Sequence, residues 1–296
     1  MSAPVDEAID DFDGGRGLVD DVARYYDANT ARFLLVGAGR GTYAIHRELW
    51  APGVRSAAEA VDHVNRLMAG EIARRVPAPG SILDLGCGVG GTMFRLAAAF
   101  PDASLVGVTI SPVQARTGRS LAGRLGLAAR CRFVRGSFGA PEVGSGHAAA
   151  VAVEAYAHVH DPRAFFEPAA AALEAGAPLV VVDDFLASPL VDLADEERRG
   201  AEAVRRGWRV PSLDTVDHAA GAADRAGFDL AEDRDLTGLV RLGRPRDRVI
   251  AMLVPAFRAL RLGRVPFFGN MIGGHALQRG LGGGSIRYRM LVFTKR

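Results

Sequence analysis

The segment 81–91, SILDLGCGVGG, constrains the fold of this chain more than any other. A short, continuous apolar run ends in glycines at 86, 88, 90 and 91, as expected where a buried parallel strand turns into a helix. Such a turn needs positive φ angles and lets a ligand approach the backbone closely. The segment therefore predicts a strand, a ligand-binding loop and a helix.

The sequence after Gly80 continues this alternation of strands and helices. Apolar runs at 104–110, 129–136, 147–153 and 177–185 predict strands, and 91–100, 111–126 and 161–176 between them predict helices. A further helix is expected at 213–227, a strand at 228–236 and a last strand at 286–296. Alternation at this spacing indicates right-handed crossovers and an open sheet covered by helices on both faces.

The rest of the chain divides into a tail, a cap and insertions. Residues 1–15 are acidic, end in two glycines and are expected to be a disordered tail. Residues 16–76 are expected to form an N-terminal helical cap, in which Ser56 and Glu59 form a capping box for its last helix. The domain 77–296 follows, interrupted by substrate-pocket insertions at 184–211 and 239–283.

Composition excludes several classes of function. The formal charge is +2, which gives no basis for bulk binding to nucleic acid. Two cysteines cannot form a disulfide framework or a four-thiolate zinc site, and the histidines show no set of ligand spacings for a metal. The N-terminus lacks the features of a signal peptide, and no run is long enough to span a membrane, so a cytoplasmic location is expected.

The glycine motif also excludes a dinucleotide fold. The spacing is G-x-G-x-G, and Asp84, two residues before the first glycine, would repel a pyrophosphate. The pattern D-x-G-C-G-x-G-G, followed by GVTISPVQ at 107–114, resembles the class I S-adenosylmethionine-dependent methyltransferases. Over residues 60–185 it is most similar to the branch of sterol, tocopherol and prenyl-diphosphate C-methyltransferases.

The resemblance implies an α/β, Rossmann-like fold. Its sheet would be open and mostly parallel with an antiparallel last strand, and N-terminal helices and a C-terminal insertion would form a lid. The implied cofactor is S-adenosylmethionine, with the methionine moiety at the glycine loop, the ribose at the end of the second strand and adenine after the third. In that order the implied residues are Asp84, Gly86, Cys87 and Gly88, then Thr109, Ile110 and Gln114, then Ser137 and Phe138.

The end of the fourth predicted strand carries the candidate chemical group, because ligands of open α/β sheets bind at the carboxyl ends of strands. Glu154 ends an apolar run there. The resemblance implies a catalytic role for Glu154 and for His158, four residues later. Methyl transfer to an alkene forms a carbocation, which an anion and aromatic faces stabilise. The alternative for Glu154 is a loop acid that holds a backbone turn. Tyr26, in a Y-Y-D segment similar to the one that covers the cofactor in this branch, is the third catalytic candidate.

Aromatic and basic residues are expected to wall the substrate pocket. Arginine outnumbers lysine, which occurs only at Lys295, so many arginines need no role beyond solubility. The segment 266–275 suits either a mobile pocket wall or the contact of a homodimer. The pocket candidates are Tyr25, Arg47, Trp50, Tyr156, Trp208 and Phe268.

These features lead to one main functional hypothesis and two alternatives. The main one is C-methylation of an alkene in a small isoprenoid, such as isopentenyl or geranyl diphosphate, with proton loss to Glu154. A magnesium ion is expected only as a companion of a diphosphate substrate. The first alternative is an O- or N-methyltransferase of a small specialised metabolite, with His158 as base. The second is a cofactor-binding subunit without activity.

Overall fold

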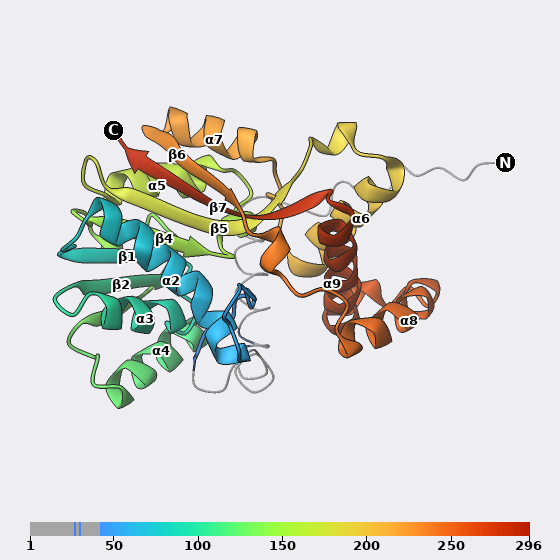
Figure 1. The fold of residues 1–296 in the computed structure, drawn as a ribbon, viewed down its shortest axis with the longest axis horizontal. Coiled ribbons are helices and arrows are strands. Elements are labelled where there is room, and N and C mark those ends of the chain that lie inside the picture. Colours follow the sequence, from blue (N-terminus) through green and yellow to red (C-terminus); the bar gives the residue numbers. More distant parts are fainter. Residues whose placement is uncertain (1–26, 28–29, 31–41) are drawn as a thin grey trace.

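A seven-stranded sheet forms the centre of the molecule (Figure 1). The computed structural model describes Asp27, Thr30 and residues 42–296. The strand order is β3-β2-β1-β4-β5-β7-β6. The strands are β1 (Ser81–Leu85), β2 (Ser104–Thr109), β3 (Cys131–Arg135), β4 (Ala149–Val153), β5 (Pro178–Leu186), β6 (Phe228–Asp235) and β7 (Ile286–Lys295).

The apolar strands pair in parallel, and the last strand pairs antiparallel with its neighbours. β1 to β5 pair in parallel, and β1, β2, β4 and β5 are apolar runs covered on both faces, as parallel strands should be. β7 is antiparallel to both of its neighbours, β5 and β6. The expected Rossmann-like sheet with an antiparallel last strand is therefore confirmed.

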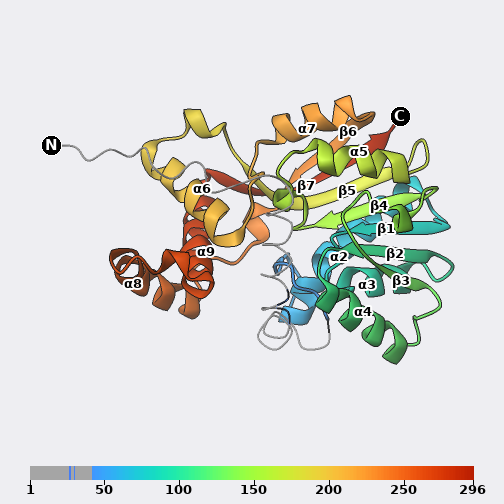
Figure 2. The ribbon, with the colours of Figure 1, turned by 180° about the vertical axis from the view of Figure 1, so that it is seen from behind.

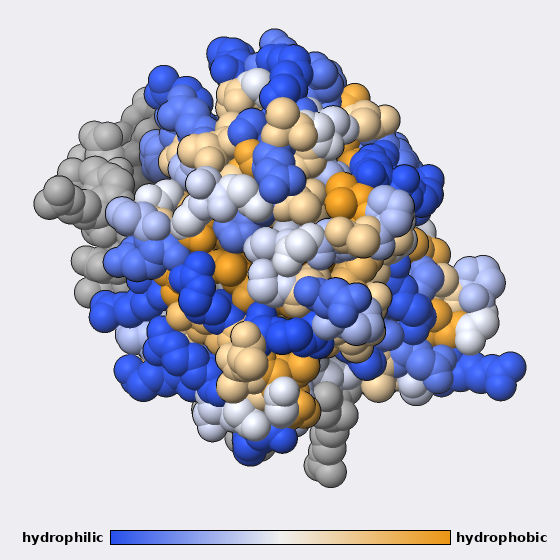
Figure 3. All heavy atoms as spheres, turned by 90° about the vertical axis from the view of Figure 1, so that its left-hand side faces the viewer, coloured by the Kyte–Doolittle hydropathy of each residue, from blue (hydrophilic) through white to orange (hydrophobic). Residues whose placement is uncertain are grey.

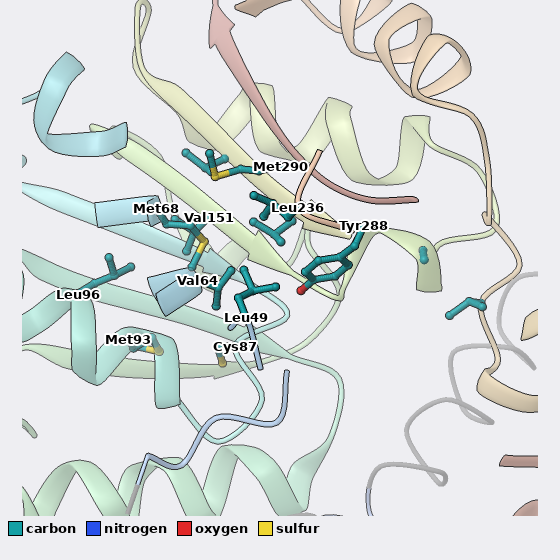
Figure 4. Close-up of a cluster of buried hydrophobic side chains, with 14 of the residues drawn as sticks. Leu49, Val64, Met68, Cys87, Met93, Leu96, Val151, Leu236, Tyr288 and Met290 are labelled. Carbon is teal, nitrogen blue, oxygen red and sulfur yellow. The ribbon is translucent and has the colours of Figure 1, made fainter. Parts of the chain in front are cut away.

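Helices cover the two faces of the sheet and define two apolar cores. The first face carries α2 (Ala57–Arg75), α3 (Gly91–Ala99) and α4 (Pro112–Arg124); part of its core, including Met68, Met93 and Met290, is shown in Figure 4. The second carries α5 (Arg163–Ala172) and α7 (Val216–Arg225), which pack on an aromatic core. Ser56 caps α2, its hydroxyl accepting from the backbone N–H of Glu59, but the predicted capping box is not formed, because the Glu59 carboxylate accepts from the backbone N–H of Arg55 and not of Ser56. Because α2 packs on α3 and β5, this part of the predicted cap is a layer of the sheet domain.

The remaining helices form a lobe beyond the carboxyl ends of the parallel strands (Figures 1 and 2). They are α6 (Asp195–Trp208), α8 (Pro245–Ala259) and α9 (Pro266–Gly283). They correspond to the two predicted insertions, except that residues 184–186 belong to β5. A Cβ at Gly207 would lie 2.5 Å from the carbonyl oxygen of Gly269 and 2.8 Å from the Cα of Gly273. The glycines of 266–275 thus let α9 approach α6 closely, a role that neither sequence interpretation of this segment included.

The two ends of the parallel strands differ in character. Figure 3 shows the end where these strands begin, where hydrophilic side chains are interspersed with smaller apolar areas. At the other end the strand order reverses between β1 and β4, since β2 and β3 follow on one side and β5 on the other. The loops diverge at such a switch point and leave a crevice, which places the ligand site there.

The described residues, Asp27, Thr30 and 42–296, contain neither a membrane-spanning helix nor a cluster of metal-ligating side chains. No helix among them is long and apolar enough to cross a membrane. Within the same part of the chain, no group of three or more histidine, cysteine, aspartate or glutamate side chains is arranged to hold a metal ion.

Candidate active site

A cavity opens at the switch point, above the carboxyl ends of β1, β2 and β4. It encloses about 870 Å³ of space, including its open mouth. Segments far apart in the sequence line it: the residues before α2, the glycine loop after β1 and the residues that follow β2, β3 and β4. The first of these segments contributes Tyr43, Ile45 and His46, which the sequence motifs do not predict.

The glycine loop has the conformation that its sequence predicts. Gly86, Gly88 and Gly90 have φ angles of 86°, 55° and 92°, where residues with a Cβ are strained. The backbone N–H groups of Gly86 and Cys87 both donate to the carbonyl oxygen of Val108, each at 3.0 Å, which ties the loop to β2. A Cβ at Gly86 would lie 2.5 Å from the Cβ of Ala155, so glycine lets this loop meet the loop after β4.

Asp84 is a buried acid at the floor of the cavity. Its Oδ2 atom has no hydrogen-bond partner among the described residues. Burial raises the pKa of this carboxyl to about 7. A buried acceptor without a partner costs free energy, so a donor or cation in the cavity would be bound favourably at this atom.

The residues after β2 and β3 line the next part of the cavity. Thr109, Ile110 and Gln114 face it, and the Thr109 hydroxyl donates to Gln114 Oε1 at 2.8 Å. Phe138 also lines the cavity. Ser137, predicted beside it, has an exposed side chain outside the described lining. A polar end followed by an aromatic face suits a ribose and an adenine ring.

Cys87 lines the cavity but is not suited to nucleophilic chemistry. Its thiol is buried, and burial raises its pKa well above the ordinary value. A thiol in this state is not ionised at neutral pH, and the thiolate is the reactive form. The structure thus agrees with a small, buried loop residue.

Glu154 holds a carboxylate at the cavity from an unusual backbone conformation. Its φ angle is 50°, and its backbone N–H donates to the carbonyl oxygen of Val182 at 2.8 Å. Oε1 accepts from the backbone N–H of Arg47 and from the hydroxyl of Tyr288, both at 2.9 Å. The side chain is 21% exposed. Non-glycine residues in the left-handed region are uncommon and gather at functional sites. Glu154 therefore holds a backbone segment, as one of the two alternatives expected, and it also lines the cavity.

Arg47 does not take the role that the sequence predicts. Instead of offering its guanidinium to a substrate, it forms a two-pronged ion pair with Asp184, with Nη1 2.6 Å from Oδ1. The guanidinium carbon lies 4.6 Å from the ring centre of Tyr288 and 5.6 Å from that of Trp208. These contacts join the segment before α2 to β5, β7 and α6. Asp184 and Tyr288 are members of the site that sequence analysis missed; the only signal was a pair of acids, Asp183 and Asp184, inside an apolar strand.

His158 lies where the sequence predicts, in the lining of the cavity. Its Nδ1 is 2.9 Å from the carbonyl oxygen of Arg209, so this nitrogen carries the hydrogen of a neutral ring. Burial lowers the pKa of the imidazole. The histidine is consequently neutral at neutral pH.

The expected aromatic wall is corrected by the structure. Tyr156 is buried on the opposite side of its loop, in ring contact with Phe165, Phe166 and Phe185, so it does not wall the pocket. Trp208 contacts Arg47. The indole N–H of Trp50 donates to Glu48, and its ring stacks under Arg241. Phe268 packs on Phe257 and Phe267. Neither of these tryptophans nor Phe268 lies in the described lining.

Tyr25 and Tyr26, of the predicted Y-Y-D segment, lie outside the described residues. The aspartate of that segment is described. Asp27 Oδ1 accepts a hydrogen bond from the hydroxyl of Ser111, the capping residue of α4. Ser111 directly follows Ile110 of the cavity lining, so Asp27 is anchored next to the cavity.

The fold and this site define a class. The sheet is open and mostly parallel, with a glycine loop after β1 and a cavity at the switch point. The cavity has a buried acid at its floor, and its lining changes from polar to aromatic. These features form a site for a nucleoside-containing cofactor. A family model described as "Methyltransferase domain" matches residues 82–176. An O-methyltransferase from Penicillium expansum is 30% identical over 200 residues, covering 67% of this chain and 69% of that protein.

Two further comparisons agree with this class. A 24-methylenesterol C-methyltransferase from Oryza sativa is 28% identical over 64% of this chain, which spans about half (49%) of the length of that relative. The solved geranyl diphosphate C-methyltransferase from Streptomyces coelicolor has the same fold, with a TM-score of 0.68 at 17% identity, over 94% of this chain and 98% of that one. The chain belongs to the class I S-adenosylmethionine-dependent methyltransferases, and its sequence is similar to those of sterol C-methyltransferases.

The cofactor of the family, S-adenosylmethionine, fits the residues present. Asp84 offers a buried acceptor without a described partner, and the positive φ angles leave the backbone of Gly86 and Gly88 accessible. Thr109 and Gln114 bring polar atoms to the lining and Phe138 brings an aromatic face, and these groups suit a ribose and an adenine ring.

Proposed function

We propose that this chain catalyses S-adenosylmethionine-dependent C-methylation of an alkene in an isoprenoid. The observation that carries the proposal is the carboxylate of Glu154, held at the cavity by two hydrogen bonds on one oxygen. The rest of the lining is largely apolar, with Tyr43, Ile45, Val153 and Ala155 among its members. An anion in such a site stabilises a positive charge strongly, because the surroundings screen it poorly.

The cofactor would supply an electrophilic methyl group when bound. The electron pair of the alkene would form a bond to this methyl carbon while the bond from the methyl carbon to sulfur breaks, which releases S-adenosylhomocysteine and leaves the other alkene carbon as a cation. Glu154 would stabilise this cation through its charge and then accept a proton from a neighbouring carbon, whose C–H electron pair forms the new double bond. The hydroxyl of Tyr288 and the backbone N–H of Arg47 hold Oε1 in place during both steps. Tyr26 is proposed to exclude water from the site.

A diphosphate head group is the finer part of the proposal. It is supported by the resemblance and by the Streptomyces coelicolor methyltransferase, which was solved in complex with Mg²⁺ and geranyl-S-thiolodiphosphate. The described lining of the cavity contains no arginine or lysine, and Arg47 is paired with Asp184. A diphosphate would therefore need cationic groups from residues outside this lining, or a magnesium ion. A sterol, which carries no such charge, needs neither.

His158 supports the alternative of O- or N-methylation. A neutral imidazole in the lining can deprotonate a phenol or an amine directly. The relative from Penicillium expansum is named an O-methyltransferase. In this case Glu154 would bind the substrate or hold its loop, and the proton would move to His158.

One experiment separates these functions. The purified chain is incubated with labelled S-adenosylmethionine and a panel of prenyl diphosphates, sterols, phenols and amines, with and without Mg²⁺, and the products are analysed by mass. Glu154→Gln keeps the size of the side chain and removes its charge, and Glu167→Gln, exposed on α5, is the matched control.

The expected result is methylation of an isoprenoid on carbon, lost in Glu154→Gln while binding of S-adenosylhomocysteine and the activity of Glu167→Gln persist. Transfer only to phenols or amines, lost in His158→Gln, would replace this function with the alternative. Cofactor binding with no turnover on any substrate would favour a subunit without activity.

A further inference from the structure

The outward face of α8 carries apolar side chains that no other part of the described structure covers. Val249, Met252, Leu253 and Leu260 are all exposed, Met252 and Leu260 by 72% and 69%. Met252 and Leu253 follow Val249 by three and four residues, and Leu260 follows Leu253 by seven, so all four lie on one side of the helix and its end. Val254, on the opposite side, is buried in the lobe. The helix is thus apolar on its packed side and on its exposed side. We call the exposed residues 249, 252, 253 and 260 the α8 face.

The surroundings of the α8 face are strongly basic. Residues 241–261 contain six arginines and one acid, Asp247, whereas the whole chain has a net charge of only +2. Two of the arginines contact the body of the protein: Arg241 stacks on Trp50, and Arg244 pairs with Glu48. The other four are exposed along the helix and at its end: Arg246, Arg248, Arg258 and Arg261. This concentration of charge selects an anionic partner.

The position of α8 leaves the face accessible. The helix lies at the outer edge of the lobe, away from the sheet, in both views of the ribbon (Figures 1 and 2). It contacts α9 and the short turn Leu262–Arg264. A second copy of the chain docked through the same face would oppose one cluster of arginines to another, which disfavours self-association.

We propose that the α8 face docks on an anionic lipid surface. An exposed apolar stripe flanked by arginines is the pattern of a helix that lies in the plane of a membrane interface. The apolar side chains would enter the boundary between head groups and acyl chains, and the guanidinium groups would donate hydrogen bonds to lipid phosphates. Such a helix lies on the bilayer without spanning it. The proposal does not depend on which substrate is methylated.

Vesicle sedimentation tests this docking. The full chain is mixed with vesicles of phosphatidylglycerol and phosphatidylcholine, or of phosphatidylcholine alone, at low and high salt. Met252→Asp places a charge in the centre of the face, and the double variant Arg246→Glu, Arg248→Glu reverses the charge beside it. Val191→Asp is the matched control, because Val191 is 81% exposed but lies outside α8. Thermal unfolding and binding of S-adenosylhomocysteine verify that each variant is folded.

The expected result is binding to the anionic vesicles that weakens with salt and falls about tenfold or more in Met252→Asp and in the arginine variant. Val191→Asp should bind like the unmodified chain. Three results would overturn the proposal: no sedimentation with anionic vesicles, equal sedimentation with both kinds of vesicle, or undiminished binding by Met252→Asp. A dimer in solution that Met252→Asp dissociates, without vesicle binding, would assign the face to a second copy instead.

Discussion

Replacement of Arg47 by methionine tests whether one buried guanidinium organises the active site. The side chain of Arg47 is 15% exposed, its partner Asp184 is 8% exposed, and Glu154 is the second carboxylate beside it, 3.6 Å from Nε. Methionine keeps much of the apolar volume between the rings of Tyr288 and Trp208 and removes the charge. The variant therefore leaves two carboxylates in a site of low exposure without their cation.

The size of the effect follows from this burial. Removal of one partner of a buried ion pair costs about 3–5 kcal/mol of unfolding free energy, because the other charge stays buried. An exposed pair such as Arg198–Asp195 contributes about 0–1 kcal/mol, so Arg198→Met is the matched control. The double variant Arg47→Met, Asp184→Asn removes both charges and should be more stable than the sum of the single changes predicts, by about 0.5–3 kcal/mol.

The assay is urea denaturation at several pH values of five proteins: the unmodified chain, Arg47→Met, Asp184→Asn, the double variant and Arg198→Met. Burial raises the pKa of Asp184 even with Arg47 present, and loss of the guanidinium will raise it further. Below the pKa of an unfolded aspartate, this carboxyl is protonated in both states, so the destabilisation of Arg47→Met should shrink on acidification and be largest at neutral pH. The reasoning is refuted if Arg47→Met loses no more stability than Arg198→Met, or if the two changes are additive.

Three further predictions concern the cavity and the lobe. The pKa of Asp84 is raised to about 7, and the cationic amino group of S-adenosylhomocysteine favours the ionised form of this carboxyl. The affinity for S-adenosylhomocysteine should therefore rise as the pH increases through about 7 and then level off. Calorimetry should find this dependence flattened in Asp84→Asn; an unchanged profile would exclude this carboxyl as its source. Tyr288→Phe removes one hydrogen bond from Glu154, worth about 1 kcal/mol, and should lower kcat several-fold at unchanged cofactor affinity in turnover assays. A Cβ at Gly207 would lie 2.5 Å from the carbonyl oxygen of Gly269, so Gly207→Val should cost about 1–3 kcal/mol in thermal unfolding. An unchanged melting temperature would mean that α6 and α9 separate freely.

Features that depend on neighbouring residues were predictable from the sequence. The glycine loop, the alternating strands and helices and the cap of α2 each depend on about ten consecutive residues, in which φ preferences and apolar periodicity act directly. For the same reason Asp84, Thr109, Gln114, Phe138, Glu154 and His158 could be placed at the carboxyl ends of strands before the fold was known. Their roles in binding and catalysis remain predictions.

The side of the loop that each residue faces was not predictable. Glu154 and His158 line the cavity, whereas Tyr156 between them is buried among phenylalanines on the other face of the sheet. The left-handed φ of Glu154 and the short helical turn Tyr156–His158 send these side chains in different directions. No apolar pattern of period two or 3.6 describes such a turn. The sequence therefore predicted that all three side chains face the pocket, whereas in the structure Tyr156 faces away from it.

The sequence by itself determined the strand order along the chain, the glycine loop and the acid at the end of β4, because these are local properties of the backbone and of apolar runs. Only the tertiary structure decided what holds that acid. Arg47 is 107 residues from Glu154 and 137 from Asp184, and Tyr288 is 134 residues from Glu154. Their meeting depends on the parallel crossovers and on the return of β7 between β5 and β6, which bring distant residues to one edge of the sheet.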